Sequence, residues 1–99
     1  LYAMSTAMKK FRQRFLKRDK VAVMATRLVE RCGRRKSSGS VRLVDVGCAY
    51  GTLAIRIAHQ LPKPIASRLE PIGIEISNHL AEKADETLRK RGGRCIHGT

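Results

Sequence analysis

Hydrophobic residues recur along the first third of the chain at intervals of three and four. Between residues 21 and 32 they fall at i, i+3, i+4, i+7, i+8 and i+11, which predicts an amphipathic helix ending near Gly33. Met8, Phe11 and Phe15 form a shorter apolar stripe upstream, and this stripe predicts another helix. Residues 34–40, RRKSSGS, are polar and rich in serine, which is typical of a flexible connector.

Short β-branched segments then alternate with helical stripes. The predicted strands are 41–46, 71–76 and 94–97. One helical stripe covers residues 53–61 and is stopped by Pro62 and Pro64, and a second consists of positions 80, 84 and 88 and is ended by Gly92 and Gly93. Residues 63–70 are a predicted loop. The first strand is apolar at both parities apart from Arg42, as in a parallel strand buried on both faces. This alternation predicts an α/β fold with a parallel sheet.

The predicted architecture is a Rossmann-like, doubly wound parallel sheet that is incomplete, with its first three strands, preceded by N-terminal helices. Residues 1–40 form a basic helical segment and linker, and residues 41–99 form the first half of the sheet domain. Both crossover helices should lie on one face of the sheet because such connections are right-handed, which leaves the N-terminal helix to cover the other face. We expect incomplete coverage, so that the chain alone folds poorly as a monomer.

The turn after the first predicted strand carries an acid and two glycines, in the stretch LVDVGCAYGTL. Ligands of open parallel sheets bind at the carboxyl ends of strands, and glycine there permits close approach. A dinucleotide fingerprint that starts at Gly47 needs glycine at positions 49 and 52, but the chain has Ala49 and Thr52. The alternative pattern acid-x-Gly-x-Gly-x-Gly is met by Asp45, Gly47 and Gly51, with Ala49 as its only departure.

A second acid follows at the end of the next predicted strand. Glu75 lies 24 residues after Gly51, where a carboxylate can accept hydrogen bonds from both hydroxyls of a ribose. Alternative interpretations are that Asp45 caps the following helix and that Tyr50 is an exposed loop residue rather than a cover for the ligand. Cys48 is interpreted as a small turn residue whose backbone matters, because no base is assignable to it.

These motifs resemble those of the class I S-adenosylmethionine-dependent methyltransferases. VDVGCAYG is similar to their first motif and PIGIEIS to their second, and the resemblance covers about residues 41–98. It implies that Asp45 holds the methionine amino end of S-adenosyl-L-methionine, that the glycine turn lies against the cofactor, that Glu75 grips the ribose, and that Ile76 lies along the adenine. The cofactor-binding residues implied are Asp45, Gly47, Cys48, Ala49, Tyr50, Gly51, Glu75 and Ile76. The methyl group of Ala49 is expected to narrow the site.

The resemblance implies a methyltransferase whose acceptor wall lies elsewhere. In that family the acceptor is positioned largely by segments after the third and fourth strands, together with N-terminal helices. We therefore expect the chain to be the cofactor-binding part of an enzyme and to transfer no methyl group alone. No catalytic residue is assigned.

Charge bears on the acceptor. The sequence has 21 lysines and arginines against 8 acids, a net charge of +13, which favours binding to polyanions. One basic segment is predicted to contact nucleic acid or another acidic partner through Lys9, Lys10, Arg12, Arg14, Lys17, Arg18 and Lys20; Arg34, Arg35 and Lys36 form a second cluster. Nucleic acid, or a protein associated with it, is the expected acceptor. The alternatives are a histone-lysine methyltransferase of the disruptor-of-silencing type and a non-catalytic, basic nucleic-acid-binding α/β module.

The cysteines indicate a reducing compartment. Cys32, Cys48 and Cys95 are odd in number and widely spaced, which fits neither a disulfide framework nor a CxxC metal site. Cys95 and His97 alone do not make a zinc site, so no metal is predicted. No apolar run predicts a membrane span. The expected location is the cytoplasm or nucleus, with an organelle as an alternative because the N-terminus is rich in arginine and poor in acids.

Overall fold

The structure is a computed structural model that describes residues 6–98, with side chains described from Lys20 onward. The elements in chain order are α1 (Thr6–Arg35), β1 (Val41–Val46), α2 (Thr52–Gln60), α3 (Lys63–Ala66), β2 (Leu69–Glu75), α4 (Asn78–Arg89) and β3 (Arg94–His97).

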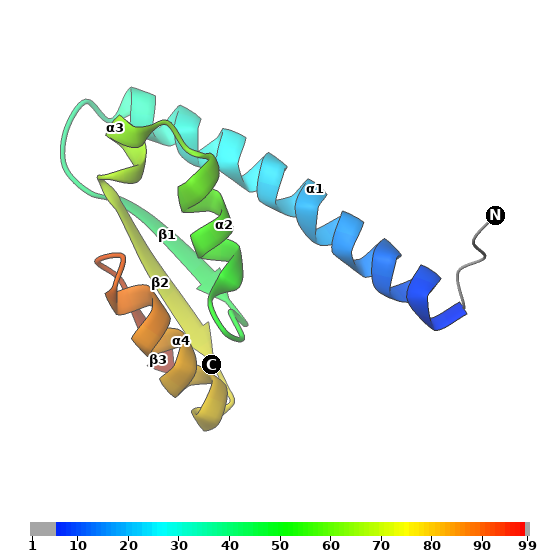
Figure 1. Cartoon of the computed structure of the whole chain (residues 1–99). Helices are drawn as coiled ribbons and strands as arrows, with labels where there is room; N and C mark the ends of the chain where they lie inside the picture. The colour runs from blue at the N-terminus through cyan, green and yellow to red at the C-terminus, as the bar shows by residue number, and fades with distance from the viewer. Residues whose placement is uncertain (1–5, 99) are drawn as a thin grey trace.

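The three strands form one parallel sheet in the order β1-β2-β3 (Figure 1). Val41 of β1 pairs with Leu69 of β2, and Ile72 of β2 pairs with Arg94 of β3. The predicted α/β fold with three parallel strands is confirmed, and β1 and β3 have the predicted bounds. β2 begins two residues earlier than predicted because residues 63–66, predicted as loop, form the short helix α3 after Pro62.

The helices all pack on one face of the sheet. The buried core contains one residue from each of α1, α2, α3, β1 and β2 together with the C-cap residue of α2, namely Val29, Ile57, Ile65, Val41, Leu69 and Leu61. α4 covers the same face further along the sheet, where Leu88 lies against Gly51 and Gly73 (Figure 1).

Within the described residues β1 is covered on one face, so the expected burial on both faces is wrong, whereas the expected incomplete coverage of the sheet is confirmed. Val41 is buried against the helices, whereas Val44 is 53% exposed and Val46 is 75% exposed. The expectation that the N-terminal helix covers this second face is also wrong, because α1 packs beside α2. Apolar residues at both odd and even positions show that both faces of a strand can be buried. They do not show which helix covers each face.

The N-terminal region is one helix in the structure instead of the predicted two. α1 runs without a break to Arg35, so Gly33 lies inside the helix and does not end it. A Cβ atom at position 33 would lie 2.7 Å from Cγ2 of Ile65. Gly33 therefore permits the close approach of α1 to α3, which is a packing role.

Most of the predicted basic N-terminal segment lies outside the residues whose side chains are described. This applies to Lys9, Lys10, Arg12, Arg14, Lys17 and Arg18, and also to the apolar stripe of Met8, Phe11 and Phe15. Lys20 is exposed. Among the helices of residues 6–98, none has both the length and the apolar character that crossing a bilayer requires.

Candidate functional site

The turn between β1 and α2 contains three residues in the left-handed backbone region. Gly47 has φ 71°, Ala49 has φ 51° and Gly51 has φ 80°. Gly51 is the N-cap of α2, and a Cβ atom there would approach Cγ of Leu88 to 3.2 Å. A Cβ atom at Gly47 would meet no other atom within 4 Å. The turn is therefore packed at Gly51 and open at Gly47, where a ligand can approach the backbone.

Backbone hydrogen bonds attach this turn to the neighbouring strand. The N–H groups of Gly47 and Cys48 both donate to the carbonyl oxygen of Ile74, at 2.7 and 3.2 Å. The N–H of Gly51 donates to the carbonyl of Cys48 at 2.9 Å. The turn thus has a defined position over the carboxyl end of β2.

Glu75 joins the turn to α4. Its Oε1 accepts the N–H of Ala49 at 2.9 Å, and its Oε2 accepts the N–H of Ser77, the N-cap of α4, at 2.8 Å. These bonds, the one from Ser77 above all, lower the pKa of Glu75 although the side chain is only 6% exposed. Each carboxylate oxygen can accept a further hydrogen bond. Glu75 therefore connects the turn to the start of α4 and can still accept hydrogen bonds from a ligand.

A cavity of about 490 Å³ lies on the other side of the turn. Its lining consists of Val21, Asp45, Gly47, Cys48, Ala49, Tyr50, Thr52, Leu53 and Arg56. Glu75 is not among these residues, so only one of the two predicted acids, Asp45, lines the cavity. Tyr50 lines the cavity and is also 53% exposed, which is compatible with both interpretations of this residue.

Asp45 is a half-buried carboxylate in this cavity. Within the described part of the chain it accepts no hydrogen bond, and burial raises its pKa. The alternative in which Asp45 caps α2 is excluded, because the N-cap residue is Gly51 and no side chain bonds to this helix end. Burying a carboxylate without a partner is unfavourable in the protein alone. A cationic group of a ligand would be a favourable partner for this carboxylate.

Comparison with solved structures identifies the fold. The chain aligns over its whole length with 36% of CalS10, an S-adenosylmethionine-bound amino pentose methyltransferase from Micromonospora echinaspora involved in calicheamicin biosynthesis, at 22% identity and a TM-score of 0.53. This chain has a class I methyltransferase-like fold. The [4+2]-cyclase SpnF aligns with 76% of the chain and 27% of its own length, at 29% identity and a TM-score of 0.46.

Sequence comparison gives a local match to the same class of enzyme. A methyltransferase of Schizosaccharomyces pombe, named as uncharacterized, is 41% identical over 49 residues, which is 50% of this chain and 16% of the relative. No protein-family model matches the chain. The chain therefore spans only a small part of the curated relative that it matches.

Cys48 packs beneath the turn of this methyltransferase-like fold. Its side chain is 6% exposed, and its Sγ lies 3.6 Å from Sγ of Cys95 on β3. A Cβ atom on Gly73 of β2 would lie 2.5 Å from the Cys48 Sγ, so the glycine leaves room for the thiol. Burial raises the pKa of Cys48 to about 12. The structure gives Cys48 a packing role, and its thiol is protonated at neutral pH.

Three residues on α2 line the cavity but were not predicted as site residues: Thr52, Leu53 and Arg56. Thr52 and Arg56 are four positions apart and so lie on one face of the helix, directly after the turn. That spacing was visible in the sequence. That this face borders the same cavity as Asp45, with Thr52 still exposed, depends on how α1 and α2 pack.

Ile76 and Ser77 follow β2 at the same edge of the methyltransferase-like sheet. Ile76 is 70% exposed, and its carbonyl oxygen accepts a hydrogen bond from Nε2 of His97 at 2.9 Å. Sequence reasoning missed Ser77, whose backbone N–H bonds Glu75. The signal that could have found it is that this serine, the last residue of the second motif, is a common N-cap residue and precedes a helical stripe.

Proposed function

We propose that the chain is the cofactor-binding part of an S-adenosyl-L-methionine-dependent methyltransferase. The observation that carries this proposal is the half-buried carboxylate of Asp45, which accepts no hydrogen bond from the described residues and lies beside the open backbone of Gly47. The local match to the fission yeast methyltransferase and the fold shared with S-adenosylmethionine-bound CalS10 support it.

The cavity suits the amino acid end of the cofactor, which carries an ammonium and a carboxylate. Asp45 offers a negative charge and Arg56 a positive charge on the same cavity wall. In the proposed complex Asp45 accepts from the ammonium and Arg56 donates to the carboxylate, each as a charge-assisted hydrogen bond. The left-handed turn passes between this end and the nucleoside.

The nucleoside is assigned to the other side of the turn. Glu75 has lone pairs that neither Ala49 nor Ser77 uses, and these can accept the ribose hydroxyls. The exposed side chain of Ile76 offers an apolar surface to the adenine. When bound, the cofactor supplies an activated methyl group on its sulfonium, so the protein must chiefly hold it and aim the acceptor.

We propose nucleic acid, or a protein bound to it, as the methyl acceptor. The net charge of +13 and the basic N-terminal segment support this class. No observation on the described residues favours the histone-lysine alternative or the non-catalytic module. The three free cysteines fit the proposed reducing, intracellular location.

The test is a calorimetric titration of the intact protein with two ligands. S-adenosylhomocysteine contains the amino acid end, and 5′-methylthioadenosine lacks it. Asp45→Asn should weaken binding of the first about tenfold or more, since a hydrogen bond between charged groups is worth about 1.5–3 kcal/mol, and leave the second unchanged. Glu75→Gln should weaken both ligands.

Stability measurements separate this role from a structural one. Because burial raises the pKa of Asp45, its charge destabilises the folded state at neutral pH, and Asp45→Asn should stabilise the ligand-free protein. Asp85→Asn is the matched control. The side chain of Asp85 pairs with Arg89 and accepts the N–H of Cys95, so this variant should lose stability and keep its affinity. The proposal fails if Asp45→Asn binds S-adenosylhomocysteine as tightly as the original protein.

A further inference from the structure

The parallel topology brings three basic segments to one edge of the sheet. Every segment that leads into a parallel strand ends at the amino edge, so residues 34–40, 63–68 and 89–93 lie there together. This edge is opposite the turn that follows Asp45 and the end of β1. β2 has seven residues, which at about 3.3 Å each separates the two edges by roughly 20 Å.

Nine basic residues gather at this edge, and we call them the basic pole. They are Arg34, Arg35, Lys36, Lys63, Arg68, Arg89, Lys90, Arg91 and Arg94. Acids neutralise only part of this charge: Glu30 pairs with Arg34 at 2.7 Å and Asp85 with Arg89 at 2.6 Å, while Glu70 pairs with Arg42 outside the pole at 3.4 Å and Glu86 lies four positions before Lys90. The positive charge of the pole is therefore largely uncompensated.

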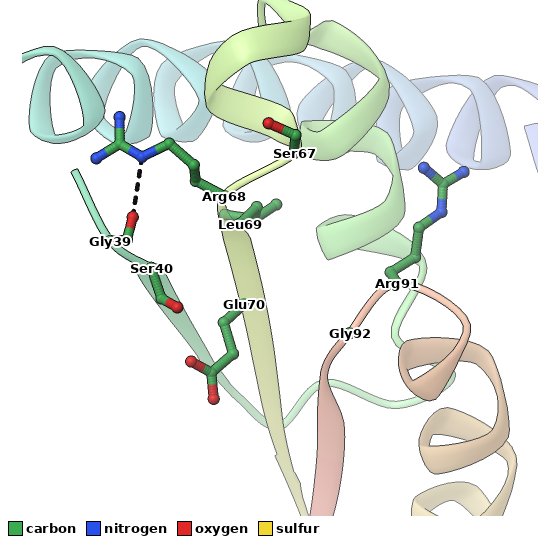
Figure 2. A pocket seen from close by; sticks show the side chains of 8 residues that line it. All are labelled: Gly39, Ser40, Ser67, Arg68, Leu69, Glu70, Arg91 and Gly92. Carbon is green, nitrogen blue, oxygen red and sulfur yellow. Dashed lines mark hydrogen bonds between the residues drawn. The ribbon is translucent and has the colours of Figure 1, made fainter. Parts of the chain in front are cut away.

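Some members of the pole hold the fold together. The guanidinium of Arg68 donates to the carbonyl oxygen of Gly39 at 2.9 Å (Figure 2). It also donates to the carbonyl oxygens of Gly33 at 3.1 Å and of Lys36, and so joins the end of α1 to the start of β2. Arg91 contacts Nε2 of His59. These contacts explain two of the arginines without any ligand.

Four other members have no such explanation. Arg35, Lys63, Lys90 and Arg94 are exposed, and within residues 20–98 none of them forms an ion pair or a side-chain hydrogen bond. The helix dipole accounts for cations in the last turn of a helix, such as Arg35. It does not account for Lys63, which is the first residue of α3, or for Arg94, which lies in β3.

The surface at the pole is hollowed where the three segments meet. One cavity of about 440 Å³ is lined by Gly39, Ser40, Ser67, Arg68, Leu69, Glu70, Arg91 and Gly92 (Figure 2). A second of about 370 Å³ is lined by Gly33, Arg34, Ser37, Pro62, Pro64, Ile65 and Arg68. Arg68 lies on the wall of both, so cations border a concave surface formed by residues far apart in the sequence.

We propose that the basic pole is a docking surface for the phosphate backbone of duplex nucleic acid. None of its nine residues is followed or preceded by an aromatic residue that would stack on an unpaired base. Contact through phosphates alone suits a duplex, whose phosphates lie on the outside. The proposal rests on charge and placement and does not depend on methyl transfer. A duplex held at the pole leaves the turn at the other edge accessible.

The experiment compares three double variants of the intact protein. Arg35→Gln with Lys63→Gln, and Lys90→Gln with Arg94→Gln, each remove two charges from different segments of the pole. Arg27→Gln with Lys83→Gln is the matched control, since both residues are exposed on helices away from the pole. Binding to duplex RNA and duplex DNA of equal length is measured by fluorescence anisotropy at several salt concentrations.

Both pole variants should bind about tenfold or more weakly at about 0.1 M salt, and the slope of log affinity against log salt should fall by about two. The control should keep the affinity and slope of the original protein. The preferred duplex, RNA or DNA, is the one for which this loss is larger. S-adenosylhomocysteine affinity should be equal in all variants, and a failure of cofactor binding in the original protein would contradict the proposed function only.

Two results would overturn the docking surface. One is an equal loss of affinity in the control, because the effect would then be one of overall charge. The other is unchanged duplex binding in both pole variants, including the case in which those variants lose binding to phosphatidylserine vesicles instead. Circular dichroism of every variant identifies any change due to unfolding.

Discussion

Ala49→Gly should stabilise this protein, although glycine usually destabilises. Ala49 has φ 51° in the turn after β1. A left-handed backbone costs a residue with a Cβ atom about 1–2 kcal/mol, and glycine does not bear this cost. Glycine loses about 0.5–1 kcal/mol through the greater freedom of the unfolded chain. The expected net gain is about 0.5–1 kcal/mol.

The hydrogen bonding of the turn should survive this substitution. The bond between position 49 and Oε1 of Glu75 comes from the backbone N–H at 2.9 Å, which glycine also has. Ala58→Gly is the matched control, because Ala58 lies inside α2 with right-handed backbone. That change should cost about 1 kcal/mol. The same chemical substitution is therefore expected to have opposite signs at the two positions.

Urea denaturation followed by circular dichroism measures both variants against the original protein. The two variants should differ by about 1.5–2 kcal/mol in free energy of unfolding, with similar denaturant slopes. If Ala49→Gly loses as much stability as Ala58→Gly, then Ala49 is not left-handed and the described turn is wrong. A gain in stability would show that the alanine stores strain beside the proposed cofactor site.

Two further predictions concern titratable groups. Hydrogen bonds lower the pKa of Glu75, so its stabilising effect should be present above its unfolded pKa of about 4.3 and be lost as the pH falls through the folded value. Glu75→Gln should therefore unfold more easily than the original protein at neutral pH. If the difference in stability persists unchanged in acid, the hydrogen bonds of Glu75 do not favour its charged form. Burial raises the pKa of Cys48 to about 12, so at about pH 8 only about one thiol in ten thousand is ionised. Iodoacetamide should therefore modify the exposed Cys32 first, as mass spectrometry of digested protein can check, and early modification of Cys48 would show that it is not buried.

Much of the fold and of the candidate site follows from the sequence alone. The bounds of β1 and the turn between β1 and α2 were predictable, because a β-branched run and glycines act on their own backbone. β3 has one β-branched residue, Ile96, and its position followed from the alternation of strands and helices. Placing Asp45 and Glu75 at the same edge required only the rule that parallel strands share a direction. These features depend on local conformation and on a topology with few alternatives.

The remaining features depend on which surfaces meet. Whether Val44 and Val46 are covered depends on where α1 packs, and an apolar pattern does not encode the position of a partner helix. Gly33 ends a helix in the sequence pattern but remains inside α1 in the structure, since Ile65 of a distant segment requires the space. The hydrogen bond from the N–H of Ala49 to Glu75 also depends on tertiary packing, because it joins segments that are distant in the sequence.

The tertiary structure alone also decided the surroundings of the charges. Arg56 faces the cavity because α2 turns that side toward Asp45. The basic pole assembles from segments up to 60 residues apart, Arg34 to Arg94, because parallel crossovers return each of them to the same edge of the sheet. Sequence determined which residues are charged and which segments are regular; packing and topology determined which of them became neighbours.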